Sequence, residues 1–146
     1  MEEGAIGKTR LIWARMIVVS DLRKIARARL EDAAVLCNAR RYDGAAYVCG
    51  YAVEMALKAR ICRTLKWNAY PSTASEFQKY QSFRTHDLDV LLHLSGRRKK
   101  IKNEHLAAWS AVADWTPNSR YGVIGSTLAR DAAEMLSSAK VLLRLL

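Results

Sequence analysis

Apolar residues recur three and four positions apart along most of this chain, and this spacing restricts the fold more than any other feature of the sequence. It is clearest near the end, on one face of the segment that carries Leu128, Ala132, Met135, Leu136, Ala139, Leu142, Leu143 and Leu146. Turn-forming residues are scarce as well, because the 146 residues include only 7 Gly and 2 Pro. An all-β domain needs many more turns. The sequence therefore predicts an all-α fold, an up-and-down bundle of four to five helices.

Breaks in the helical spacing divide the chain into five predicted helices. They are expected from about Ser20 to Cys37, from Ala45 to about Lys66, from His86 (with Thr85 as its cap) to about Leu94, from Asn103 or Glu104 to Asp114, and from Ser126 or Thr127 to the end. The first two should pack antiparallel, because only a short break separates them. The second is rich in Ala and Gly, which favours a central place in the bundle or in a dimer interface.

The domain organisation follows from the same pattern. Residues 20–146 are expected to form a single helical bundle domain. Residues 1–19 are expected to form an N-terminal extension that is partly helical, with a turn or two between Arg10 and Val19.

Several features predict a cytoplasmic protein that does not enter a membrane. The longest uncharged run is the ten residues from Gly44 to Val53, whereas a spanning helix needs about 20 apolar residues. The apolar stretch from Leu11 to Ser20 contains Arg15 and lacks the basic start of a signal peptide. Three cysteines are an odd number and show no CxxC spacing, so we expect reduced thiols in the core: Cys37, Cys49 and Cys62.

The charge balance favours an anionic partner. The chain has 24 Lys and Arg against 14 Asp and Glu, a net charge of +10. Such an excess suits polyanions such as nucleic acid, although a solvated basic surface would give the same composition. Five of the six residues from Arg97 to Lys102 are basic and follow Gly96, which predicts an exposed loop with a concentrated positive patch.

One stripe of the second predicted helix combines polar and aromatic residues. Tyr47, Tyr51, Glu54 and Lys58 are spaced by four, three and four positions. Glu54 and Lys58 are expected to form an exposed ion pair that contributes a few tenths of a kcal/mol. A structural polar stripe and a ligand site both fit this spacing.

Common catalytic motifs are missing: the sequence has no GxGxxG, GxxxxGK[ST], HExxH or GxSxG. His86, Asp89 and His93 share a helix face, but one helix rarely supplies a complete metal shell, so no metal or other cofactor is predicted. Arg98 and His105 suit metal-independent RNA cleavage, in which His moves the proton of the 2′-hydroxyl and Arg stabilises charge on phosphorus. With 15 Arg and 3 His in the chain, this spacing also arises by chance.

Three segments occur in an order that is similar to a known family. The first is RRYDGAAY at residues 40–47, which runs into GYAVE at 50–54 and LKA at 57–59. The second is THDL at 85–88 with Leu91 and Leu92 after it, and the third is the pair Arg120 and Tyr121. Together they resemble the HEPN domains, helical nucleotide-associated domains of prokaryotes and higher eukaryotes. The resemblance covers the chain from about Ser20 to its end.

This resemblance implies a helical bundle that usually dimerises, so we expect a homodimer. It also implies a nucleotide or RNA ligand and a separately encoded nucleotidyltransferase as partner, in a toxin–antitoxin, defence or RNA-processing system. At the matching positions, Lys58 and Arg120 would contact phosphate and Tyr121 would stack or hydrogen-bond. The others would hold the site together: Glu54, His86 and Asp87. Alternatively, Glu54, Lys58, His86 and Asp87 only tie helices to one another.

Whether the chain is an enzyme is left open by the sequence. Active ribonucleases of the family carry Arg, then four to six residues, then His, with two copies of the motif meeting across the dimer; Arg98 and His105 fit the upper limit. Lys99 and Leu106 stand beside them where active members tend to have a residue like Asn and a Tyr. The sequence therefore favours a module that binds nucleotide or RNA phosphate. A metal-independent endoribonuclease and a non-catalytic helical adaptor are the alternatives.

Overall fold

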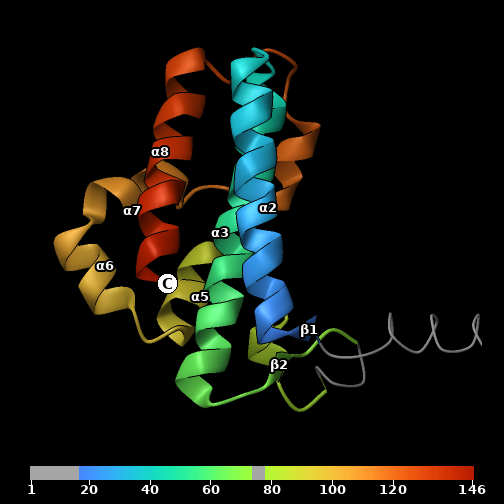
Figure 1. Ribbon diagram of the computed structural model, residues 1–146, viewed down its shortest axis with the longest axis vertical. Coiled ribbons are helices and arrows are strands. Elements are labelled where there is room, and N and C mark those ends of the chain that lie inside the picture. Colours follow the sequence, from blue (N-terminus) through green and yellow to red (C-terminus); the bar gives the residue numbers. More distant parts are fainter. Residues whose placement is uncertain (1–16, 74–77) are drawn as a thin grey trace, which may run out of the picture.

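The computed structural model describes residues 17–73 and 78–146, and these residues form an all-α bundle with one minute β-sheet (Figure 1). The predicted fold class is confirmed. In chain order the elements are β1 (Ile17–Val18), α2 (Val19–Asn38), α3 (Tyr42–Leu65), β2 (Ala69–Tyr70), the 3-10 helix η1 (Gln81–Phe83), α5 (Leu88–Leu94), α6 (Arg98–Glu104), α7 (Leu106–Val112), the 3-10 helix η2 (Pro117–Tyr121) and α8 (Ala129–Leu145).

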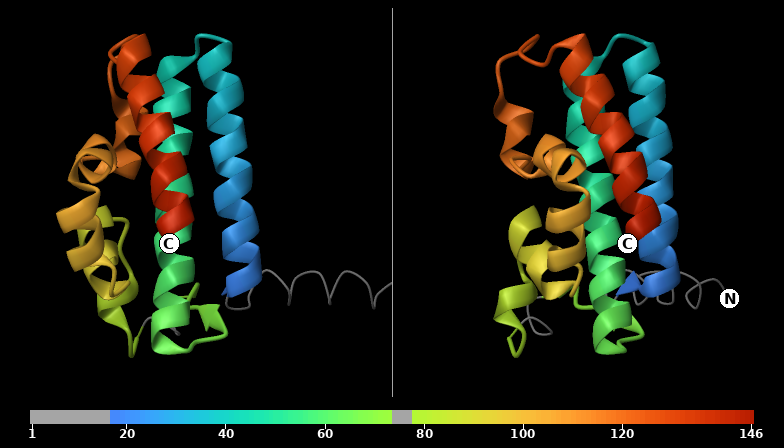
Figure 2. Two further views of the ribbon diagram at one scale, coloured as in Figure 1. Left: turned by 60° about the vertical axis from the view of Figure 1, so that its left-hand side comes forward. Right: turned by 90° about the vertical axis from the view of Figure 1, so that its left-hand side faces the viewer.

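Three long helices make the centre of the molecule. α2 and α3 run antiparallel, as predicted, and α8 lies against both in the same direction as α3 (Figures 1 and 2). The reversal after α2 is tight because Arg40 adopts a left-handed backbone conformation with φ of 60°. α5, α6 and α7 lie on the side of α3 away from α2 (Figure 2). This arrangement leaves α3 surrounded on most sides.

The small residues of α3 let other segments of the same chain pack closely against this helix. Ala45, Ala52 and Ala59 are buried. A Cβ atom built at Gly50 would lie 2.1 Å from the ring of Trp115, so only glycine lets this indole pack against the helix. Of the two places predicted for the Ala- and Gly-rich helix, the centre of the bundle is confirmed. The expected homodimer stays a prediction.

The basic segment after Gly96 is helical, so the predicted loop is wrong. α6 forms there because Ile101 is fully buried and anchors the segment to the core. The exposure expected of Arg98, Lys99 and Lys100 is confirmed. The fourth predicted helix begins later than expected, as α7 at Leu106.

Three further boundaries differ from the prediction. α5 begins at Leu88 because Asp87, not Thr85, caps it: Asp87 Oδ1 accepts hydrogen bonds from the backbone N–H groups of Asp89 and Val90, at 2.9 and 3.2 Å. α8 begins at Ala129, after a loop that is bound to Asp43. At the N-terminus, Ile17 and Val18 pair antiparallel with Tyr70 and Ala69. The other residues of the expected extension, 1–16, lie outside the described residues.

The three cysteines are free thiols. Cys49 and Cys62 are buried, as predicted, and burial raises the pKa of Cys49 to about 12 and that of Cys62 to about 11. Cys37 is only half-buried. Among the described helices, none is long and apolar enough to cross a membrane.

Candidate functional site

The candidate site is built on Glu54, a carboxylate at the centre of α3 with no exposed surface. Its Oε1 lies 3.8 Å from Lys58 Nζ and is hydrogen-bonded to His86 Nδ1. Its Oε2 has no hydrogen-bond partner among the described residues. The expected exposed ion pair is therefore wrong, because α5 and the segment before it cover this face of α3. A buried carboxylate must be paired, so the stability of the fold depends on the contacts of Glu54 with Lys58 and His86.

Lys58 neutralises Glu54 from one turn further along α3. Its side chain is 13% exposed, and Nζ lies 5.2 Å from the centroid of the Tyr70 ring. Burial lowers the pKa of Lys58, and the Glu54 carboxylate opposes that effect. The Tyr70 hydroxyl donates a hydrogen bond to the Phe83 carbonyl at 2.7 Å, which fixes the ring below the ammonium group.

His86 reaches Glu54 from the short segment that leads into α5. The Thr85 hydroxyl accepts a hydrogen bond from the backbone N–H of Asp87 at 3.0 Å, and the Asp87 side chain caps the helix, so both neighbours hold His86 in place. The His86 side chain is 61% exposed. Because Nδ1 is bound to Glu54, Nε2 is the ring nitrogen that is left for a further partner.

An open cavity of about 600 Å³ lies beside these residues. Its walls come from α3, from the start of α5, from the segment between α7 and η2 and from η2 itself. The lining includes Tyr51, His86, Asp87, Trp115, Asn118 and Arg120. The rings of Tyr51 and Trp115 meet edge to face, with centroids 4.8 Å apart. The Trp115 Nε1–H is buried and has no hydrogen-bond partner among the described residues. The cavity therefore combines cationic, aromatic and hydrogen-bonding groups with the carboxylates of Asp87, which caps α5, and Asp114.

Arg120 brings a permanent positive charge to this cavity. Hydrogen bonds with Tyr121 and then Tyr47 raise the pKa of Arg120, so its charge is independent of pH. The guanidinium carbon lies 4.8 Å from the centroid of the Tyr121 ring. Tyr121 itself is 76% exposed and stands outside the cavity lining.

The predicted site residues thus fall into two groups. Glu54, Lys58 and His86 are in contact, and His86 shares the cavity lining with Asp87 and Arg120. Arg98 and His105 lie apart from it, on α6: Arg98 is the first residue of that helix and His105 follows its last. Seven positions correspond to about 10 Å of helical rise, so these two side chains begin far apart within one chain.

No described group of three or more His, Cys, Asp and Glu residues is arranged to hold a metal ion.

Two residues that shape the site were not predicted from the sequence. Trp115 was not singled out, although it directly precedes the Thr-Pro break at residues 116–117. Asp43 anchors the loop that follows Arg120 and Tyr121: it accepts hydrogen bonds from the backbone N–H of Gly125 at 2.6 Å and of Thr127 at 2.9 Å. These bonds lower the pKa of Asp43. The sequence offered one indication of this role, because Asp43 lies in the RRYDGAAY segment that resembles the family.

The family model of the HEPN domain matches residues 19–146. The chain belongs to the HEPN domain family. The matched range of this HEPN chain begins at the first residue of α2 and includes every residue of the candidate site. Family membership supports a nucleotide- or RNA-related module in general. Comparisons with curated proteins and with solved structures gave no significant match.

Proposed function

We propose that this HEPN domain binds the phosphate of a nucleotide or of RNA in the cavity between α3, the start of α5 and η2 with the segment before it. The observation that carries the proposal is the placement of Arg120 and His86 on the wall of one open cavity beside aromatic rings. Arg is suited to phosphate because its guanidinium donates several hydrogen bonds in a fixed plane. Exposed aromatic rings such as Tyr121 provide stacking surfaces for a base.

The remaining residues act from beneath the cavity. Glu54 holds the imidazole ring of His86 through Nδ1, so that Nε2 is the ring nitrogen turned toward phosphate. Lys58 balances the charge of Glu54 and is held below the surface, so we assign phosphate contact to Arg120 and His86. Asp87 serves as the cap of α5 that positions His86.

A matched pair of arginine variants tests this proposal. Arg120→Ala removes the cation of the cavity, whereas Arg130→Ala removes an 83%-exposed arginine on α8. Calorimetric titration with ADP and with a short uridylate RNA should show at least about tenfold weaker binding for Arg120→Ala, the size of one charge-assisted hydrogen bond. The Arg130→Ala variant should bind like the wild type. Equal binding by all three proteins would exclude this cavity as the phosphate site.

The wider assignment rests on family membership. We propose that the domain acts as a cytoplasmic homodimer with a separately encoded nucleotidyltransferase, in a toxin–antitoxin, defence or RNA-processing system. Sedimentation at tens of micromolar tests the dimer, and a species of 16.4 kDa alone would contradict it.

An endoribonuclease that uses Arg98 and His105 is the second candidate. α6 supports it because seven positions make almost two full turns, which brings both residues to the same side of the helix. A second copy would then have to complete the site.

A further inference from the structure

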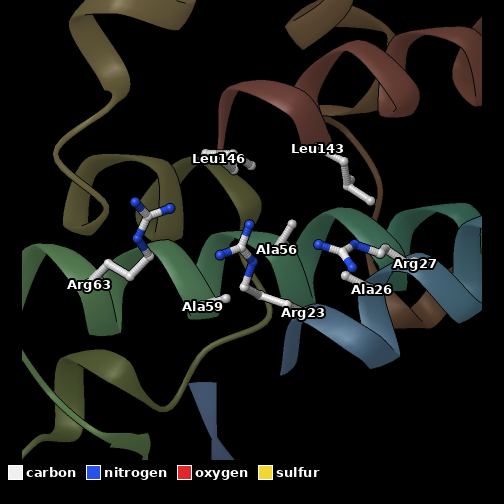
Figure 3. Close-up of a pocket in the computed structure, with 8 residues that line it drawn as sticks. All are labelled: Arg23, Ala26, Arg27, Ala56, Ala59, Arg63, Leu143 and Leu146. Atoms are coloured by element: carbon white, nitrogen blue, oxygen red, sulfur yellow. The ribbon is translucent and has the colours of Figure 1, made fainter. Parts of the chain in front are cut away.

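Three arginines surround a small apolar pocket between α2, α3 and the end of α8 (Figure 3). Arg23 and Arg27 come from α2, and Arg63 comes from the last turn of α3. Figure 3 shows their guanidinium groups gathered beside the last turn of α8. The floor consists of alanine and leucine side chains: Ala26, Ala56, Ala59, Leu143 and Leu146.

This pocket is separate from the candidate cavity. Each residue turns an α-helix by about 100°, so Ala56, Ala59 and Arg63 lie on the face of α3 opposite to Glu54 and Lys58. α3 itself stands between the two sites. A ligand of one site therefore does not touch the residues of the other.

The positive charge at this pocket is not balanced within the described part of the chain. The ion pairs found there involve none of the three arginines. The end of α8 contributes about half a negative charge through its free carbonyl groups, and the carboxylate of Leu146 adds one more, which leaves the three arginines in excess. Arg60 adds to the excess: burial lowers its pKa, and the charges of Arg97 and Arg63 lower it further. A bound anion would relieve this repulsion.

We propose that the pocket docks an acidic peptide segment of a partner protein, which inserts one small apolar side chain between the three arginines. Carboxylates match the planar guanidinium group, and the apolar floor removes the inserted side chain from water. A nucleic-acid backbone would leave that floor unused. A second copy of this chain would bring two arginine groups together across a two-fold axis, against a net charge of +10 per chain.

The probe is a fluorescein-labelled peptide of sequence EELEE, and the control peptide carries serine in place of leucine. Fluorescence polarisation compares the wild type with Arg23→Gln/Arg27→Gln. A second double variant, Arg40→Gln/Arg130→Gln, removes two exposed arginines outside the pocket. The pocket variant should bind the leucine peptide at least about tenfold more weakly, and the control variant should bind it like the wild type. The serine peptide should bind the wild type several-fold more weakly than the leucine peptide.

Four results would overturn the proposal. Equal losses in both double variants would show only general attraction to a basic protein. Equal affinity for the two peptides would show that the apolar floor takes no part. Failure of the leucine peptide to bind at millimolar concentration would remove the site altogether. Displacement of the peptide by a uridylate RNA in the wild type, at concentrations below those of the peptide, would assign the pocket to nucleic acid instead.

Discussion

Replacing Glu54 by glutamine should destabilise the fold by about 3 kcal/mol. The change keeps the shape of the side chain and an oxygen that accepts a hydrogen bond from His86, but it removes the charge that balances Lys58. Breaking a buried ion pair costs about 3–5 kcal/mol, because one charge stays buried without a partner. We expect the lower end of that range because the Lys58 side chain is 13% exposed and can regain some water. The contact with His86, whose side chain is 61% exposed, adds little.

Urea unfolding followed by circular dichroism measures this effect. For a domain of this size, each kcal/mol shifts the melting temperature by about 2–4 °C, so a loss of about 6–12 °C should accompany Glu54→Gln. The double variant Glu54→Gln/Lys58→Met removes both charges and should recover most of the loss. A loss below about 1 kcal/mol in Glu54→Gln, or no recovery in the double variant, would refute the argument that this pair is buried and mutually dependent.

Three other variants test separate parts of the structure. Gly50→Ala should cost about 1–3 kcal/mol in urea unfolding because the added Cβ meets the Trp115 ring; an unchanged midpoint would contradict that contact. Because the pKa of Asp43 is lowered by folding, its stabilisation is complete above the unfolded value of about 4 and is lost as pH falls through the folded value. The melting temperatures of wild type and Asp43→Asn should therefore differ at pH 6 and draw closer as the pH falls below about 4, whereas a constant difference would argue against an ionised cap. RNA incubated in EDTA with the His105→Ala variant should stay as intact as RNA incubated with the wild type. A wild-type cleavage rate that falls by about two to four orders of magnitude in the variant would instead establish the ribonuclease.

The long helices could be predicted because their apolar faces follow the helical period over many turns. α6 could not, since its four basic residues, three of them exposed, conceal the single buried Ile101 that holds the segment in a helix. The start of α5 differs for a similar local reason: Thr85 and Asp87 both suit a cap, and only the backbone geometry distinguishes them.

The candidate site depends on contacts that no local pattern contains. Glu54 and His86 are 32 positions apart, and Asp43 and Gly125 are 82 apart. Family resemblance supplied the residues Glu54, His86 and Arg120, and helical spacing predicted the pair of Glu54 with Lys58, but neither predicted that this pair is buried. The role of Trp115 could not be predicted because it depends on the contact of its ring with Gly50, which is distant in the sequence.

The indole resonance of Trp115 tests most directly the claim that the cavity lined by Arg120 and His86 binds the phosphate of a nucleotide. Trp115 lines the cavity, and its Nε1–H is buried beside Gly50 without a hydrogen-bond partner among the described residues, whereas Trp109 is buried in α7 outside that lining. In a nitrogen–proton correlation spectrum of labelled protein titrated with ADP, the Trp115 indole signal should shift progressively and saturate, while that of Trp109 stays in place. The Arg120→Ala variant should need at least about tenfold more ADP for the same shift. A Trp115 signal that stays fixed while ADP binds elsewhere would contradict the account.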